Sequence, residues 1–330
     1  MKQLLKWIRK RWHNDLYHEL QEIKKELQDN KKDILANQAM MLFQRHNLDY
    51  LLKNEISSVQ HSNYSEFLSD KNVEEHLMKR YSLLKEHNPP YIRAYCVVCD
   101  KYTVMSPHYS EGSPSETYFC CGMNGRMRAM YEYIVTHFQN NKRVYIQEAI
   151  TPAYNAYEKF FGPDNISGSE YIGFDKICGE YYKYNGNRIM HQDCTKLSFN
   201  DNTFDLLISQ HVFEHIFDVK KALSESIRVL KDDGYSIISI PFFYDSQNSV
   251  MLIEQGENGR INQIIDPPEI HGNPITGIES PTFWHHGWDF VEAMRDVGYR
   301  DVQVHFFSNL YKGYLGLIPI ITGKKSTTSP

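Results

Sequence analysis

The sequence contains no apolar run that approaches the length of about eighteen residues that a membrane-spanning helix needs. It also lacks the charged, apolar and small-residue succession of a secretory signal peptide. We therefore expect a cytoplasmic protein, either free in solution or bound peripherally at the inner face of the membrane.

An excess of positive charge is also missing, since the formal net charge is -5. This balance disfavours nucleic acid as a partner.

The chain has only 6 cysteines in 330 residues. In an intracellular chain of this size they predict free thiols or metal ligands, not a disulfide framework.

Glycine and proline are absent from the first 88 residues, so nothing there interrupts a long helix. Two series of positions, each with a spacing of seven, form a heptad seam with a polar middle, which favours a coiled coil over an ordinary amphipathic helix. The first series is Leu20, Leu27, Ile34, Met41 and Leu48, and the second is Leu16, Ile23, Asn30, Asn37, Gln44 and Leu51. We expect a homo-oligomer formed through this arm.

Residues 2–12 combine five cations with an apolar stripe at Leu4, Ile8 and Trp12. A helix of this composition can lie at the surface of an anionic membrane. The alternatives are a solvated basic helix end and a contact with a partner subunit.

A second module contains Cys96, Cys99, Cys120 and Cys121. A Cys-x-x-Cys pair followed by two more cysteines about twenty residues on is the general layout of a zinc ribbon. The second pair is adjacent, which strains a chelate, so His108 is an alternative ligand. We predict one structural zinc ion here, with a metal-free packing module as the alternative. The following Arg126 and Arg128 are expected to reach an acidic substrate or the neighbouring domain, or to lie exposed.

From residue 144 onward, strand-like segments alternate with helical ones, which predicts a parallel sheet with its ligand site beyond the carboxyl ends of the strands. Glu148 and Glu170 end the first two strands and lie 22 residues apart. An acidic residue at about that offset can accept hydrogen bonds from both hydroxyls of a ribose. The five segments are 144–148, 165–170, 188–193, 204–210 and 235–241.

The segments HQDCTKLSF (191–199), NTFD (202–205), SQHVFEH (209–215) and RVLKDDG (228–234) carry a family resemblance. They resemble the Methyltransferase-11-like branch of the class I methyltransferases that depend on S-adenosylmethionine (SAM). The resemblance covers about 180 residues. It implies an α/β fold with a Rossmann-like, doubly wound and mostly parallel seven-stranded sheet. It also implies an enzyme that uses SAM as cofactor.

The resemblance assigns roles to residues that end the strands. It places Glu170 on the ribose, Tyr171 beside the adenine, and Asp193 with Cys194 at the adenine amino group. Gln210 and His211 would line the methionine side. The family's first loop usually reads E-x-G-x-G, but this chain has EAITPAY at 148–154. We expect a variant loop in which Glu148, Ala149 and Thr151 contact the cofactor, and a domain that no longer binds SAM is the alternative.

Methyl transfer to a hydroxyl needs a base, and histidine suits that role at neutral pH. His211 is our first candidate and His215 the second, although the resemblance favours a structural pairing of His215 with Glu214. An insertion between residues 242 and 282 is rich in proline, glycine and asparagine and is expected to shape the acceptor site. The acceptor-contacting candidates are His271, Trp284, His285 and His286.

These features predict four parts. Residues 1–60 form the basic start and the coiled-coil helix, residues 61–140 a helical linker and the cysteine module, residues 141–324 the methyltransferase domain, and residues 325–330 a tail. The predicted function is O-methylation of a saccharide or lipid-linked glycan near the membrane. The alternatives are methylation of a small metabolite, and a non-catalytic coiled-coil scaffold with a degenerate methyltransferase domain.

Overall fold

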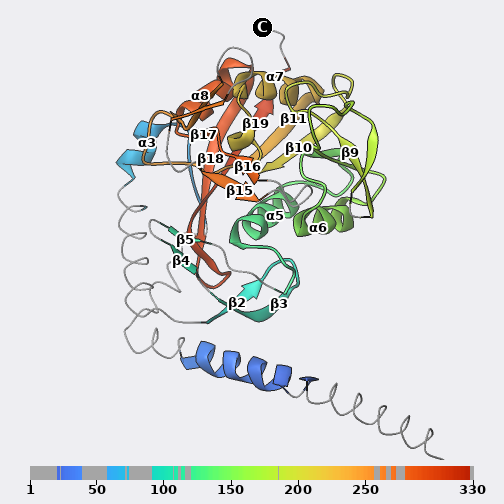
Figure 1. The fold of residues 1–330 in the computed structure, drawn as a ribbon. Helices are drawn as coiled ribbons and strands as arrows, with labels where there is room; N and C mark the ends of the chain where they lie inside the picture. The colour runs from blue at the N-terminus through green and yellow to red at the C-terminus, as the bar shows by residue number, and fades with distance from the viewer. Residues whose placement is uncertain are drawn as a thin grey trace, which may run out of the picture.

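The computed structural model describes residues 21–22, 24–38, 58–70, 73, 91–106, 108–110, 113–115, 120–184, 186–255, 261–264, 269–272 and 279–327. Its centre is a nine-stranded sheet in the order β1-β18-β19-β11-β10-β6-β7-β9-β8 (Figure 1). The sheet strands are β1 (Val59–His61), β6 (Val144–Ile146), β7 (Ile166–Glu170), β8 (Tyr181–Tyr184), β9 (Asn187–His191), β10 (Phe204–Gln210), β11 (Leu230–Ser239), β18 (Tyr299–Asn309) and β19 (Tyr314–Lys325).

The direction of the strands confirms the predicted Rossmann-like architecture. Strands β9, β7, β6, β10 and β11 pair in parallel. Strand β19 is antiparallel to both β11 and β18, so β18 again runs in the common direction. The predicted seven-stranded core is therefore present, and its last strand, β19, is inserted antiparallel between β11 and β18. The short antiparallel strands β1 and β8 extend it at the two edges.

Helices cover both faces of the sheet (Figure 1). On one face α5 (Gly125–His137) and α6 (Pro152–Phe161) pack against Ile146 and Ile208. On the other, α7 (Val219–Val229) and α8 (Asp289–Asp296) pack against Leu207 and Ile238. Because successive side chains of a strand point to opposite faces, β10 contributes to both cores. Its apolar run is therefore that of a strand buried on both sides.

Polar side chains set where the helices begin. Asn124 accepts a hydrogen bond from the backbone of Met127 and caps α5, and Asp218 does the same for α7 through Lys221. Such caps satisfy backbone donors that the first turn of a helix leaves unpaired. None of the helices in the described part of the chain combines the length and the hydrophobicity that crossing a bilayer requires.

The remaining elements are short and surround the sheet. Near the amino-terminal part of the chain they are α3 (Tyr64–Ser69), β2 (Ile92–Cys96), β3 (Lys101–Met105), β4 (His108–Ser110) and β5 (Ser113–Ser115). The turn after β10 is η1 (Phe213–His215), and the insertion forms β12 (Val250–Met251), β13 (Ile253–Gln255), β14 (Ile261–Gln263), β15 (Ile270–Gly272), β16 (Glu279–Pro281) and β17 (Trp284–His285).

Residues 21–38 of the predicted arm are helical, apart from residue 23, which is not described. Leu27 and Ile34 of the heptad seam are 63% and 58% exposed, whereas Ala36 is buried. Asp33 pairs with Arg93 of β2 at 2.6 Å. These two seam residues are therefore not buried against the part of the chain that the structure describes. The coiled coil stays a prediction, because the other apolar positions of the seam lie outside the described residues. The same holds for the basic segment 2–12 and for residues 74–86 of the predicted helical linker.

Candidate functional site

Glu148 and Glu170 come together at the carboxyl edge of the sheet, because β6 and β7 are neighbouring parallel strands. The backbone N–H of Ile150 donates to Oε1 of Glu170 at 2.9 Å. Burial raises the pKa of Glu170 to about 7, against the opposing effect of the Ile150 and Ala149 amides. Glu170 therefore gains its full negative charge only above neutral pH.

The first loop, which lacks the family's glycines, is a helix start. Thr151 caps α6 by accepting from the N–H of Tyr154 at 3.1 Å, and Pro152 occupies the first helical turn. Proline is favourable there because that N–H would have no partner within the helix. The Tyr154 ring lies so close to Gly168 that a Cβ at residue 168 would meet it at 2.3 Å. The loop is thus packed tightly onto β7.

Glu148 is 8% exposed, and its Oε2 has no hydrogen-bond partner among the described residues. Burial, and then the nearby Glu170, raise the pKa of Glu148 well above its usual value. A buried carboxyl in this situation favours the approach of a cation. Beside it, Gln210 donates from Nε2 to the Tyr157 hydroxyl at 3.2 Å, which orients the side chain that ends β10.

The predicted adenine side lies at the ends of β7 and β9, where Glu170 and His191 are paired in register. Nδ1 of His191 accepts from the N–H of Ile172, and the Tyr171 ring, 52% exposed, lies 5.4 Å from the His191 ring. Asp193 accepts from both the N–H and the hydroxyl of Thr195. Burial raises the pKa of the neighbouring Cys194 thiol. The structure therefore brings Tyr171, Asp193 and Cys194 to the predicted edge.

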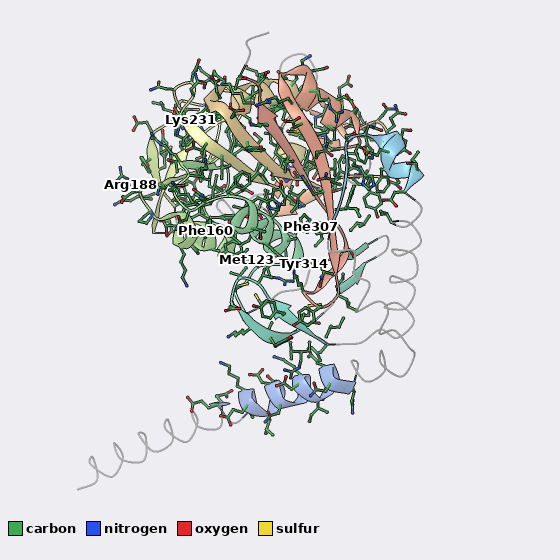
Figure 2. All side chains as sticks on the ribbon, turned by 180° about the vertical axis from the view of Figure 1, so that it is seen from behind. Met123, Phe160, Arg188, Lys231, Phe307 and Tyr314 are labelled. Carbon is green, nitrogen blue, oxygen red and sulfur yellow. The ribbon has the colours of Figure 1, made fainter. Side chains whose placement is uncertain are left out.

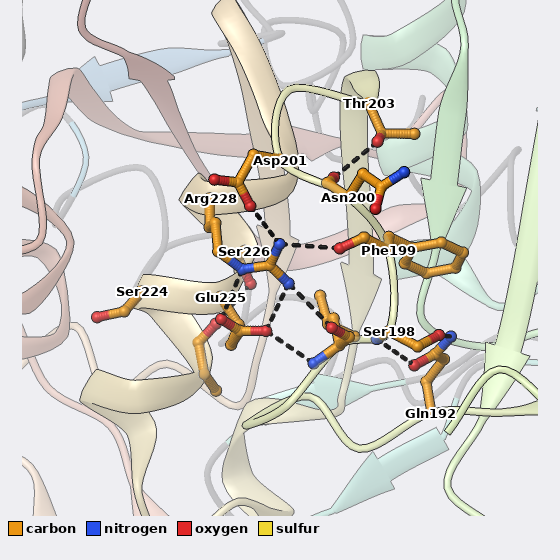
Figure 3. A network of polar contacts seen from close by, with 12 residues as sticks. Gln192, Ser198, Phe199, Asn200, Asp201, Thr203, Ser224, Glu225, Ser226 and Arg228 are labelled. Atoms are coloured by element: carbon orange, nitrogen blue, oxygen red, sulfur yellow. Dashed lines mark hydrogen bonds and ion pairs between the residues drawn. The ribbon is translucent and has the colours of Figure 1, made fainter. Parts of the chain in front are cut away.

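A network around Arg228 holds the segment that follows Asp193 (Figure 3). The guanidinium donates to both carboxylate oxygens of Glu225, to Asp201, and to the carbonyls of Phe199 and Leu197. Arginine's planar fork suits this kind of multiple recognition. The network joins α7 to the loop between β9 and β10. Sequence reasoning used Arg228 only as part of a motif and missed this contact set.

His211, the first candidate base, follows β10 in an unusual conformation with φ of 56°. Its Nδ1 lies 3.0 Å from Oε1 of Glu214, which is fully buried. Burial acts to raise the pKa of Glu214, but the contacts with His211 and His215 outweigh it and lower that pKa. An Nη atom of Arg126 lies 3.4 Å from Nδ1 of His211. Three groups from α5 and the β10 turn thus form one polar cluster.

His215 is engaged differently, because its Nδ1 donates to the carbonyl of Pro281 at 2.8 Å. The N–H of Phe283 donates to the Glu214 carbonyl, and the indole N–H of Trp284 donates to the carbonyl of Phe217. These contacts join the returning part of the insertion to the turn after β10. His215 accordingly anchors the insertion in this structure.

The predicted acceptor residues divide into two groups. His285 pairs with Glu269 at 2.6 Å and stacks on the Phe243 ring at 4.3 Å, with Phe243 39% exposed. His286 is 2% exposed and packs on Phe290, and burial lowers its pKa to about 4. His286 therefore lies in the core, and its contact with the acceptor stays a prediction. The backbone of His271 is in β15, but its side chain is outside the described residues.

The four predicted metal ligands also converge. The sulfur atoms of Cys96, Cys99, Cys120 and Cys121 all lie within 4.8 Å of one another, so the adjacent pair does not prevent a shared site. Sγ of Cys121 is 3.7 Å from Sγ of Cys96, and this contact lowers the pKa of Cys96 to about 5. The side chain of His108, the alternative ligand, is outside the described residues.

Part of this site lies in a segment that matches a known protein family. Residues 171–238 match the family described as a methyltransferase domain. The chain is 35% identical over 81 residues to the demethylmenaquinone methyltransferase of Bacteroides fragilis. That match covers 24% of this chain and 33% of the relative, so the chain spans about a third of the length of the curated relatives it matches.

Among solved structures, the chain is similar to one in the complex between the Haloferax volcanii Trm112 methyltransferase activator and a methyltransferase. The identity is 14% and the TM-score 0.40, with 62% of this chain and 90% of that chain covered. A SAM-dependent methyltransferase from Mesorhizobium loti is also 14% identical, with a TM-score of 0.37 and coverage of 56% and 91%.

Proposed function

We propose that this protein binds SAM and transfers its methyl group, since residues 171–238 match the methyltransferase domain family. The observation that carries the proposal is the pair Glu148 and Glu170, two largely buried carboxyls at the carboxyl edge of adjacent parallel strands. Ligands of open α/β sheets bind at this edge. Mass spectrometry of the purified, denatured protein tests it: SAM or S-adenosylhomocysteine is expected at up to one equivalent.

The residues present fit the parts of SAM. Glu170 would accept hydrogen bonds from the ribose hydroxyls, with Tyr171, Asp193 and Cys194 around the adenine. Glu148, whose buried Oε2 lacks a partner among the described residues, would receive the methionine ammonium. Ala149, Thr151 and Gln210 would complete the methionine side. The missing glycines are compatible with this role because SAM has no pyrophosphate for a glycine-rich loop to cradle.

His211 would act as the general base. This role requires the proton of His211 to be on Nδ1, 3.0 Å from Oε1 of Glu214, so that the lone pair of Nε2 accepts the proton of an acceptor hydroxyl. SAM supplies an electrophilic methyl group. The step breaks the bond between sulfur and methyl carbon, forms a bond from the acceptor oxygen to that carbon, and leaves the proton on His211. His215 would hold the insertion in place.

The proposed acceptor is a saccharide or lipid-linked glycan. The exposed Phe243 ring stacks on the ring of His285, which pairs with Glu269, and so offers an aromatic surface beside hydrogen-bonding groups. Trp284 directly precedes His285 in the chain. Sugars present apolar C–H faces and polar hydroxyls that match such a surface. The second candidate acceptor is a small metabolite, and the Bacteroides fragilis relative, a demethylmenaquinone methyltransferase by name, supports a non-glycan acceptor.

We further propose that the arm makes a homo-oligomer and brings it to a membrane. The exposed Leu27 and Ile34 support the first part, since a heptad seam buries such residues only against another helix. Residues 2–12 would supply the peripheral membrane contact at the inner face. Flotation with anionic vesicles tests this part: deleting residues 1–12 should abolish it.

The four cysteines would hold one structural zinc ion. A tetrahedral site with Zn–S bonds of about 2.3 Å requires sulfur separations of about 3.8 Å. The separation of 3.7 Å between Cys96 and Cys121, and the limit of 4.8 Å for all pairs, match this requirement. Elemental analysis should give one zinc per chain, and Cys121→Ser should remove it.

A further inference from the structure

Residues 59–70, which precede the cysteine module in the sequence, add a strand and a short helix to one edge of the sheet. All three residues of β1 pair antiparallel with β18, and α3 follows directly. Figure 1 and Figure 2, which view the molecule from opposite sides, both show α3 at the β18 edge of the sheet. The segment is therefore part of the methyltransferase domain in space, although the first parallel strand of that domain begins only at Val144.

Phe67 anchors this segment in an aromatic cluster of the domain. Its ring centroid lies 5.1 Å from that of Phe306, 5.5 Å from that of Tyr244 and 5.8 Å from that of Trp288. Aromatic pairs at such separations add to the stabilisation that burial of apolar area provides. The ring of His61, a residue of β1 that is 4% exposed, lies 5.5 Å from that of Phe67. Side chains as well as strand pairing therefore dock the segment on the domain.

Hydrogen bonds fix the turn between β1 and α3. The hydroxyl of Tyr64 donates to the carbonyl of Asp245 at 2.8 Å, and Arg295 of α8 donates to the carbonyl of Ser62. The carboxylate of Glu66 accepts from both the N–H and the hydroxyl of Ser62. A helix of six residues has little stability of its own, so α3 depends on these contacts for its order.

The loop that begins the insertion, residues 244–249, is held on one side by the start of α8. The indole N–H of Trp288 donates to the carbonyl of Tyr244 at 2.8 Å. Asp289 accepts from both the N–H and the hydroxyl of Ser249. The domain itself therefore fixes this side of the loop.

Tyr64 and Phe67 hold the same loop from the edge of the sheet. Their contacts on the loop are the carbonyl of Asp245 and the ring of Tyr244. These two loop residues directly follow Phe243, whose ring forms the aromatic surface proposed for the acceptor. Because a single peptide bond joins Phe243 to Tyr244, a change in either contact would shift the Phe243 ring.

We propose that residues 59–70 are a clasp that sets the position of the acceptor surface, with Tyr64 and Phe67 as positioning residues for Phe243. The acceptor role of Phe243 rests on the function proposed above, whereas the coupling of clasp and loop does not. In the sheet, strands β18, β19, β11 and β10 separate β1 from β6. The clasp therefore acts on the acceptor side and leaves the edge that carries Glu148 and Glu170 unchanged.

Hydrogen–deuterium exchange on the full chain tests the coupling. Phe67→Ala should speed exchange severalfold in β1, in α3 and at residues 243–249, where the N–H groups of Phe243 and Ser246 are hydrogen-bonded, while β6 and β10 keep their protection. Leu68→Ala is the matched control, because Leu68 is 58% exposed on the same helix, and it should exchange like the wild type. Unchanged exchange at 243–249 in Phe67→Ala, or an equal rise over the whole sheet, would overturn the proposal.

Fluorine NMR tests the positioning of the ring itself, with residue 243 replaced by para-fluorophenylalanine. Tyr64→Phe keeps the aromatic cluster and removes only the hydroxyl that reaches Asp245, so the fold is retained. It should shift the fluorine resonance, whereas Leu68→Ala should leave it in place. A resonance that Tyr64→Phe does not move would remove Tyr64 from the clasp.

Calorimetric titration of the same proteins with SAM keeps the two proposals separable. Tyr64→Phe should bind SAM with the affinity of the wild type, because the clasp lies away from the cofactor edge. Coupled exchange without SAM binding by the wild type refutes only the methyltransferase. SAM binding without coupled exchange refutes only the clasp.

Discussion

Oε1 of the buried Glu214 carboxylate lies 3.0 Å from Nδ1 of the His211 imidazole. A carboxylate in this position fixes the tautomer of a catalytic histidine and stabilises its protonated form. The left-handed backbone of His211 is consistent with a residue whose orientation is imposed by its surroundings. This relationship favours His211 as the general base over His215, whose Nδ1 donates a hydrogen bond to the carbonyl of Pro281 in the insertion.

His211→Gln should slow methyl transfer to a hydroxyl acceptor by roughly 10²–10⁴-fold, because the base is lost. SAM affinity should fall much less than the rate, because His211 is only one of the residues expected to line the methionine side. The measurement is the single-turnover rate of radiolabelled methyl incorporation, alongside calorimetric SAM affinity. His215→Gln is the matched comparison and should lower stability more than rate. A His211→Gln enzyme as fast as the wild type would exclude this base.

SAM affinity should rise as the pH increases through about 7. The pKa of Glu170 in the free protein is raised to about 7, and the ribose hydroxyls are best accepted by the charged carboxylate. Below that pH the protonated form binds more weakly. Glu170→Gln should reduce affinity by roughly 10–100-fold and remove this transition, since hydrogen bonds to a charged group are worth more than those to an amide. A Glu170→Gln profile identical to that of the wild type would remove Glu170 from the ribose site.

Arg228→Ala should lower the free energy of unfolding by roughly 2–4 kcal/mol, because it removes the guanidinium donors of Glu225 and of the Phe199 and Leu197 carbonyls, and the N–H of Leu197 is then the remaining donor to Glu225. Urea denaturation measures the change. Lys231→Ala removes a more exposed pair with Asp205 and should cost about 0–1 kcal/mol. Equal effects of the two substitutions would mean that the network in Figure 3 is not specially stabilising.

Leu27→Asp combined with Ile34→Asp should convert the oligomer to a monomer, because two charges at heptad positions prevent burial of the seam. Light scattering after gel filtration reports the mass. Gln28 is exposed and belongs to neither heptad series, so Gln28→Asp should leave the mass unchanged. A wild-type chain that is already monomeric at high concentration would refute the arm's proposed role.

The strand pattern could be predicted from sequence, because β6, β10 and β11 are apolar runs that end in polar residues and because the motif between 191 and 234 fixes their order. The way in which the first loop accommodates Pro152 could not be predicted, since it depends on Thr151 capping α6. The contact of Arg126 with His211 joins residues 85 positions apart, and no local pattern signals it. The same limit applies to His286: the sequence showed a histidine beside aromatics but not that its side chain is buried against Phe290.

The most direct test of the account is calorimetric titration of the zinc-loaded full chain with SAM at pH 8, where Glu170 is charged. The account predicts saturable binding of one SAM per chain that Glu170→Gln weakens. No detectable heat at high protein concentration, together with no SAM or S-adenosylhomocysteine in the purified protein, would contradict it.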